Sequence, residues 1–164
     1  MLSKTIQDAI NEQINKELYS SYLYLAMSAY CAEQNMSGFA SWMSMQSREE
    51  TTHGMKLYGY VHDRSGHVEL EAIDKPHPKF KSPADMFKQV VEHEQKVSAM
   101  ITKLYELAVK EKDYPTQIML EWFITEQIEE EKTAGEILEQ LKMVGDSPVS
   151  LIMMDRQLAA RAAK

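Results

Sequence analysis

Four long stretches of the chain repeat apolar residues at the spacing of an amphipathic helix, and this pattern constrains the fold more than any other feature. In the first stretch, for example, Ile6, Ile10 and Ile14 fall on one helical face. The four helices are expected to run from about Ser3 to Gln34, Ser37 to Arg64, Ser82 to Glu111 and Pro115 to Val144, with a short fifth helix from Ser147 to about Ala162. Strand signals are few, so the sequence predicts an all-α protein.

The expected helix ends have recognisable capping residues. Ser82-Pro83 and Ser147-Pro148 each place a capping hydroxyl before a proline at the first helical position. Ser3 or Thr5 is expected to cap the first helix, and Ser37 the second, whereas Gly145 should end the fourth. Gly135 lies inside the fourth helix, where glycine costs about 1 kcal/mol relative to alanine. The sequence leaves open whether it marks a kink or close packing.

The connection between the second and third helices is long and rich in proline. It reads SGHVELEAIDKPHPKFKSP, and Pro76, Pro78 and Pro83 forbid a continuous helix. Short loops join the other long helices, so each of those pairs should be antiparallel. The long crossover lets the second and third helices run parallel. We therefore expect a four-helix bundle with a long crossover and a short C-terminal helix, in one domain over residues 1–164.

An acid or amide interrupts an apolar heptad line on every long helix. Residues seven apart on a helix lie almost above one another, so such a residue points toward the core with its neighbours in the line. The interrupting residues are Glu17, Glu50, Glu94, Gln127 and Glu130. All fall near the middle of their helices, at about 1.5 Å of rise per residue, so they can meet at one height. His53 shares a helical face with Glu50 in a Glu-x-x-His motif.

Such a set of carboxylates needs a counter-charge. A single glutamate of this kind could lie at the edge of the core, with its aliphatic carbons packed and its carboxylate in water. Several buried carboxylates repel one another and take up protons, whereas a pair of metal dications removes both penalties. Carboxylate and imidazole are suitable ligands for iron or manganese. A helical bundle that serves only for interaction, with its inward acids protonated or paired with lysine, remains an alternative.

Charge and composition exclude several other classes. The formal net charge is −7, which disfavours nucleic acid as a partner. Cys31 is the single cysteine, so an intrachain disulfide and cysteine-based metal motifs are excluded. The N-terminus has no apolar signal core, and no run of about 18 apolar residues predicts a membrane span. We therefore expect no membrane partner and a cytoplasmic location.

The order and spacing of these polar residues resemble those of the haem-free ferritins of bacteria and archaea. The resemblance covers essentially the whole chain and rests on Glu17, Tyr24, Glu50, His53, Glu94, Gln127 and Glu130, with Trp122 shortly before Gln127. It implies the ferritin-like form of the four-helix bundle. It also implies iron as the bound metal.

The resemblance further implies a role for each matching residue. Glu17, Glu50 and His53 would hold a first iron of a di-iron centre. Glu94, Glu130 and a bridging Glu50 would hold the second. Gln127 would be a weak ligand or a hydrogen-bonding group, and Tyr24 would hydrogen-bond to a ligand carboxylate and donate an electron. A third iron site would use Glu49, Glu126 and Glu129, with Glu130 shared.

The implied function is iron storage and detoxification. A ferroxidase centre would oxidise Fe(II) with O₂ or H₂O₂, and Fe(III) mineral would be stored in a hollow shell of 24 identical subunits. Haem-containing bacterioferritins have a Met after the bridging Glu and a second Glu-x-x-His in the fourth helix. Here those positions are Thr51 and Gln127-x-x-Glu130, so no haem is expected. A bacterioferritin-like haem protein and a soluble di-iron oxidase or oxygenase remain alternatives.

The other histidines are expected to lie outside the site. His93 is adjacent to Glu94, about 100° away from it around the helix, and is predicted to face outward.

Overall fold

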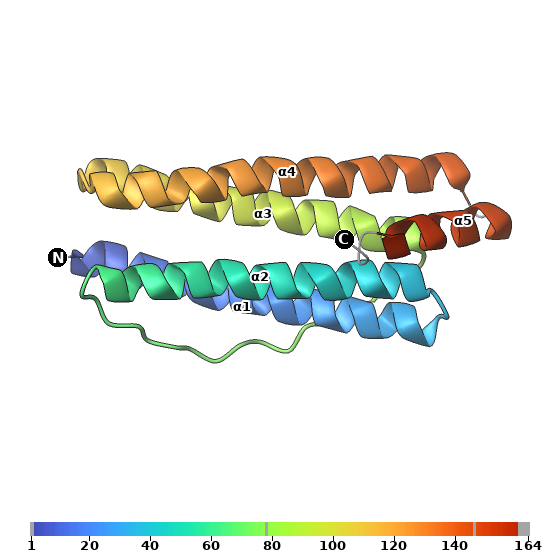
Figure 1. The fold of residues 1–164 in the computed structure, drawn as a ribbon, viewed down its shortest axis with the longest axis horizontal. Coiled ribbons are helices and arrows are strands. Elements are labelled where there is room, and N and C mark those ends of the chain that lie inside the picture. The colour runs from blue at the N-terminus through green and yellow to red at the C-terminus, as the bar shows by residue number, and fades with distance from the viewer. Residues whose placement is uncertain (1, 78, 146, 161–164) are drawn as a thin grey trace.

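The computed structural model describes residues 2–77, 79–145 and 147–160, and over these residues the chain forms five helices and no strand (Figure 1). They are α1 (Lys4–Glu33), α2 (Ser37–Asp63), α3 (Pro83–Lys110), α4 (Tyr114–Val144) and α5 (Pro148–Ala159). The predicted all-α fold is confirmed. Over the same residues, none of the helices is both long and apolar enough to cross a membrane.

The helices form two antiparallel pairs, α1 with α2 and α3 with α4, which lie side by side (Figure 1). The crossover between α2 and α3 runs along the first pair, so α2 and α3 are parallel as predicted (Figure 1). Side chains of α1 hold the crossover in place. Asn11 donates a hydrogen bond to the carbonyl of His67 at 3.1 Å, and Asn15 donates to the carbonyl of Ala72 at 3.1 Å.

Local hydrogen bonds explain why most helices begin where the sequence predicts. The hydroxyls of Ser3, Ser82 and Ser147 accept from backbone amides three residues ahead, at 3.3, 3.1 and 3.4 Å. Asp113 caps α4 in the same way, with its carboxylate 3.2 Å from the amide of Thr116.

The prediction that Ser37 caps α2 is wrong. Ser37 is already helical, and Met36 precedes α2 without a side-chain capping bond. Instead the carboxylate of Asp155, on α5, accepts from the amide of Phe39 at 3.0 Å. The cap comes from a distant part of the chain, so no local pattern could reveal it.

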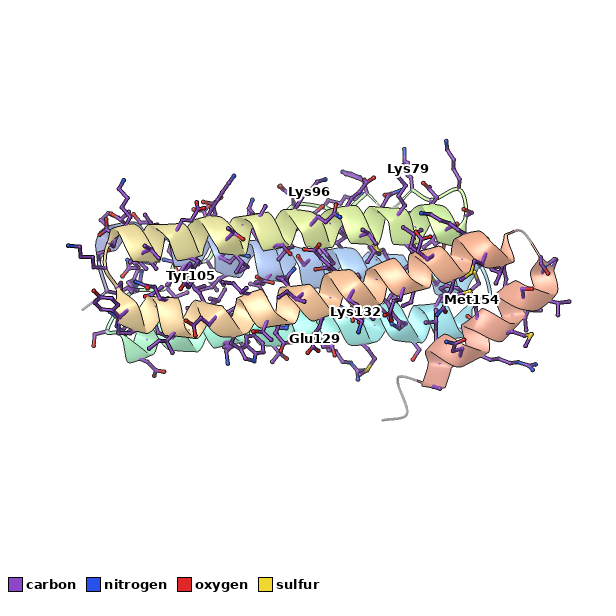
Figure 2. The ribbon with its side chains drawn as sticks, turned by 90° about the horizontal axis from the view of Figure 1, so that it is seen from above. Lys79, Lys96, Tyr105, Glu129, Lys132 and Met154 are labelled. Carbon is purple, nitrogen blue, oxygen red and sulfur yellow. The ribbon has the colours of Figure 1, made fainter. Side chains whose placement is uncertain are left out.

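Apolar side chains fill the bundle on both sides of a polar layer. Tyr24, Phe39, Trp42 and Phe87 belong to the cluster at the α5 end, which Met154 and Leu158 of α5 complete. Figure 2 shows Met154 between α5 and the bundle. Another cluster, with members such as Ile10, Leu57 and Phe123, fills the opposite end. Gly135 has no described atom within 4 Å of where a Cβ would lie, so close packing does not explain it.

Candidate metal centre

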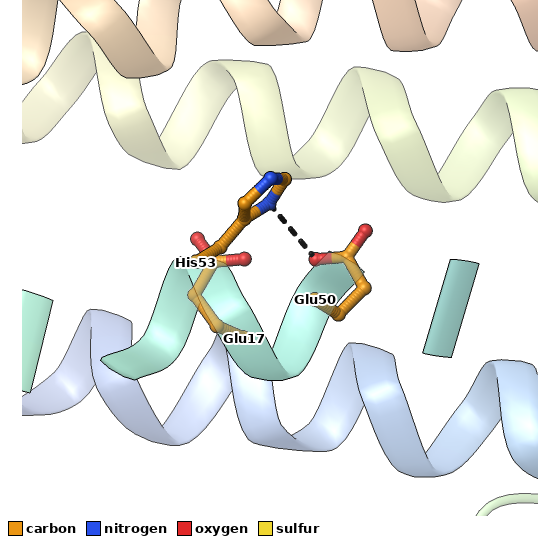
Figure 3. A group of neighbouring side chains, drawn as sticks. All are labelled: Glu17, Glu50 and His53. Carbon is orange, nitrogen blue, oxygen red and sulfur yellow. Dashed lines mark ion pairs between the residues drawn. The ribbon is translucent and has the colours of Figure 1, made fainter. Parts of the chain in front are cut away.

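Helical spacing brings two ligand types to one point on α2. Glu50 and His53 are one turn apart, and Nδ1 of His53 lies 3.6 Å from Oε2 of Glu50 (Figure 3). Glu17 approaches from α1, so that the three side chains offer ligand atoms that all lie within 4.8 Å of one another. This separation suits a single metal ion bound by two carboxylates and an imidazole.

These three side chains are almost completely shielded from water, with at most 5% of each exposed. Burial, and after it the nearby charge of Glu50, raise the pKa of Glu17 to about 8. Burial likewise raises the pKa of Glu50 well above its ordinary value, with the charge of Glu94 as the next cause. The metal-free protein therefore holds protons here that a bound cation would displace.

Glu94 enters the layer from α3 and is held by two donors. The hydroxyl of Tyr24 donates to Oε1 of Glu94, and Gln127 donates to Oε2 at 3.2 Å. Burial raises the pKa of Glu94, while these two hydrogen bonds lower it. Burial also raises the pKa of Tyr24 well above its ordinary value, so this phenol stays protonated and remains a donor.

Glu130 is only half-buried and is hydrogen-bonded to α2, and its charge also contributes to the raised pKa values of Glu50 and Tyr24. Gln46, which is fully buried, donates to Oε2 of Glu130 at 2.8 Å. Within the described parts of the chain, no other set of His, Cys, Asp or Glu brings three ligand atoms as close as Glu17, Glu50 and His53 do. The ligand atoms of the predicted second set, Glu50, Glu94 and Glu130, are therefore more widely spaced than those of the first.

The residues of the expected third site surround a pocket between α2 and α4. Glu49, Glu126, Glu129 and Glu130 line this acidic pocket, whose volume is about 310 Å³. Figure 2 places Glu129 on the α2 side of α4. His53 and Trp122 also line the pocket, and their ring centroids lie 5.4 Å apart. The pocket thus connects solvent with the imidazole of the candidate centre.

Sequence reasoning missed Gln13 and Gln46. Gln13 donates to Oε1 of Glu17 at 2.7 Å, and Gln46 donates to Glu130. A usable signal exists, because each glutamine precedes a predicted ligand by four residues and so shares its helical face.

The prediction that His93 faces outward is wrong. Its Nε2 lies 2.8 Å from the hydroxyl of Ser20, and its ring meets that of Tyr24 edge to face with centroids 6.1 Å apart. Burial lowers the pKa of His93 to about 4, so the imidazole is neutral. The turn of 100° away from Glu94 points His93 at α1, because α3 packs on α1, and the side chain stays only partly exposed.

The fold and the buried group together define a class of protein, a four-helix bundle with a candidate metal centre of carboxylates and one imidazole in its middle. A family model for the ferritin-like domain matches residues 7–144. The chain therefore belongs to the ferritin family of iron-storage proteins.

Curated relatives match almost the whole chain. A bacterial non-heme ferritin of Staphylococcus haemolyticus is 40% identical over 162 residues, which cover 99% of this chain and 98% of that protein. A bacterial non-heme ferritin of Staphylococcus aureus is 38% identical over 161 residues, covering 98% and 97%.

Solved structures agree in both fold and length. An engineered closed form of the Archaeoglobus fulgidus ferritin superimposes with a TM-score of 0.96 at 40% identity, covering 97% of each chain. The open-pore ferritin of the same archaeon gives a TM-score of 0.95 at 40% identity, covering 96% of each.

Proposed function

We propose that this protein is a ferroxidase that stores iron. Residues 1–164 form one ferritin-like di-iron domain, which oxidises Fe(II) with O₂ or H₂O₂ and passes Fe(III) into a hollow shell of 24 copies in the cytoplasm. The observation that carries this proposal is the buried group of Glu17, Glu50 and His53, whose ligand atoms lie within 4.8 Å of one another.

The two iron ions divide the polar layer between them. Glu17, Glu50 and His53 hold the first ion. Glu94, Glu130 and the bridging Glu50 hold the second. Tyr24 and Gln127 orient Glu94, and this role is supported by their hydrogen bonds to its two oxygens.

The ligand chemistry favours oxidation. Anionic oxygen ligands stabilise Fe(III) more than Fe(II), because the harder and more highly charged ion gains more from them. Two Fe(II) ions each lose one electron, and O₂ accepts both electrons together with two protons to become H₂O₂. H₂O₂ can replace O₂, since it accepts two electrons and two protons to become water.

The acidic pocket gives the ions a route and a third site. Its carboxylates, from Glu49, Glu126, Glu129 and Glu130, attract cations to the side of His53 that faces the pocket. We expect Fe(II) to approach the centre through this pocket and Fe(III) to leave by it.

The surface of α5 supports assembly. Val149, Ile152 and Met153 are each more than half exposed in the single chain. Apolar groups gathered on a short helix are typical of subunit contacts. With a chain mass of 18.9 kDa, 24 copies total about 450 kDa, which gel filtration distinguishes from a monomer or dimer.

The decisive experiment is addition of Fe(II) to the metal-free protein under air. We expect rapid formation of an amber colour, lost in Glu17→Ala and Glu50→Ala although both variants still elute as the assembled shell. Glu106→Ala removes an exposed carboxylate of α3 and should oxidise iron like the wild type. Oxidation by the wild type no faster than in buffer alone would defeat the proposal.

A further inference from the structure

A groove between α1 and α3 approaches the candidate centre from the side away from the acidic pocket. Its volume is about 250 Å³. Five uncharged residues form most of its wall: Ala9, Gln13, Met100, Leu104 and Leu107. Four of these are apolar, and all four belong to or pack against the apolar cluster at that end of the bundle.

Gln13 joins this groove to the metal centre. It lines the groove, is only 4% exposed, and donates from Nε2 to Oε1 of Glu17 at 2.7 Å. One amide side chain therefore stands between a solvent-accessible groove and a candidate iron ligand. That side chain can change between staggered rotamers while both helices stay in place.

The two approaches differ in charge. Four carboxylates line the acidic pocket between α2 and α4. The groove carries one carboxylate, Glu12, and two ammonium groups, Lys16 and Lys103. A site with this balance does not concentrate Fe(II), whereas its apolar wall suits a small uncharged molecule.

We infer that the groove is the entry port for dioxygen, with Gln13 as its gate, and that Fe(II) and O₂ reach the centre from opposite faces. This inference rests on the ferroxidase function proposed above. Separate entry keeps the acidic pocket free for cations while the oxidant arrives behind Glu17. Gln13 is then a positioning residue, because it acts through its hydrogen bond to Glu17 and by controlling the access of O₂ to the centre.

Substitutions that fill the groove between α1 and α3 test whether it is the entry port for O₂. Ala9→Phe adds a ring to its wall, and Ala99→Phe adds the same ring at an exposed position of α3 outside the groove. At saturating Fe(II), the KM for O₂ of Ala9→Phe should rise by about threefold or more, with kcat and the dependence on Fe(II) unchanged. Ala99→Phe should keep the wild-type KM for O₂. An unchanged KM for O₂ in an assembled Ala9→Phe protein would overturn the port.

A structural readout separates this inference from the proposed function. Xenon occupies apolar cavities that admit small uncharged molecules, so wild-type crystals under xenon pressure should show it in the groove. Ala9→Leu, a smaller change for the case in which Ala9→Phe does not fold, should displace the xenon. Absence of xenon from the wild-type groove contradicts the port, whereas failure of the wild type to oxidise Fe(II) contradicts the ferroxidase function itself.

Discussion

At the scale of single residues, burial sets the protonation of the candidate ligands. Glu17, Glu50 and Glu94 all have raised pKa values, with removal from water as the largest cause. A carboxylate that is costly to ionise in the empty site becomes favourable once a dication shares it. Burial of these carboxylates therefore destabilises the metal-free protein at high pH and increases the affinity of the site for a metal cation.

The metal-free protein should lose stability as pH rises. Between pH 4.5 and about 8, folded Glu17 keeps a proton that the unfolded chain has released, so the free energy of unfolding falls across this window. The effect amounts to a few kcal/mol and is complete above the folded pKa. We expect the Tm of the metal-free wild type to fall from pH 5 to pH 8 more than that of Glu17→Gln. Parallel Tm profiles would refute this account.

Gln127→Glu should hold iron more tightly. In the metal-free protein Gln127 donates to Glu94 at 3.2 Å, and a carboxylate there removes the donor and adds a like charge. Loss of this hydrogen bond should lower the free energy of unfolding of the metal-free protein by about 1–3 kcal/mol. An iron ion at the second position, in contrast, gains an anionic ligand. Stopped-flow absorbance should show slower loss of Fe(III) from the centre. Gln95→Glu, on an exposed position of α3, is the control. Unchanged iron release in Gln127→Glu contradicts the idea.

At the scale of helices, α5 is built into the start of α2. Asp155 caps Phe39, and a Cβ at Gly38 would lie 1.6 Å from the backbone oxygen of Asp155. Only glycine permits so close an approach. Met154 and Leu158 then reach the core from this docked position.

Gly38→Ala should displace α5. Relief of the clash moves Met154 and Leu158 out of the core, at a cost of about 1–3 kcal/mol. The measurements are Tm and the rate of proteolysis within α5. Gly135→Ala is the matched control, because nothing described lies near its Cβ position, and it should raise stability by up to about 1 kcal/mol. Equal effects of the two substitutions would show that α5 is not held at Gly38.

At the scale of the whole molecule, one chain leaves part of its apolar surface uncovered. The exposed side chains of α5 lie at the end of the bundle, where Figure 1 places this helix. They cannot reach the chain's own core, since Met154 and Leu158 already occupy the inner face. In the shell proposed above, other copies of the chain would cover them.

Ile152→Asp should prevent full assembly. A carboxylate buried among apolar groups of neighbouring subunits is costly, so the particle should elute well below about 450 kDa. Ala99→Asp puts the same charge on an exposed position of α3 and should leave the assembly intact. The helical content by circular dichroism should be unchanged in both. An Ile152→Asp shell of full size would contradict burial of α5 between subunits.

The sequence by itself determined the helices and indicated the candidate metal ligands. Apolar periodicity defined the helices, and the hydroxyls of Ser82 and Ser147 marked their starts, because these signals act within a few residues. The heptad lines also predicted that Glu17, Glu50 and Glu94 point toward the core, because in a regular helix the spacing of residues along the sequence sets the face on which each side chain lies.

Only the tertiary structure decided what each side chain meets. Asp155 supersedes Ser37 as the partner of the α2 start, and His93 turns to Ser20 on α1, because those contacts join segments far apart in the chain. The approach of Glu17 to Glu50 and His53 likewise depends on how α1 packs on α2. Periodicity gives the direction of a side chain from its own helix axis, whereas the neighbouring helices decide whether that direction ends in solvent, in another ligand or at a groove.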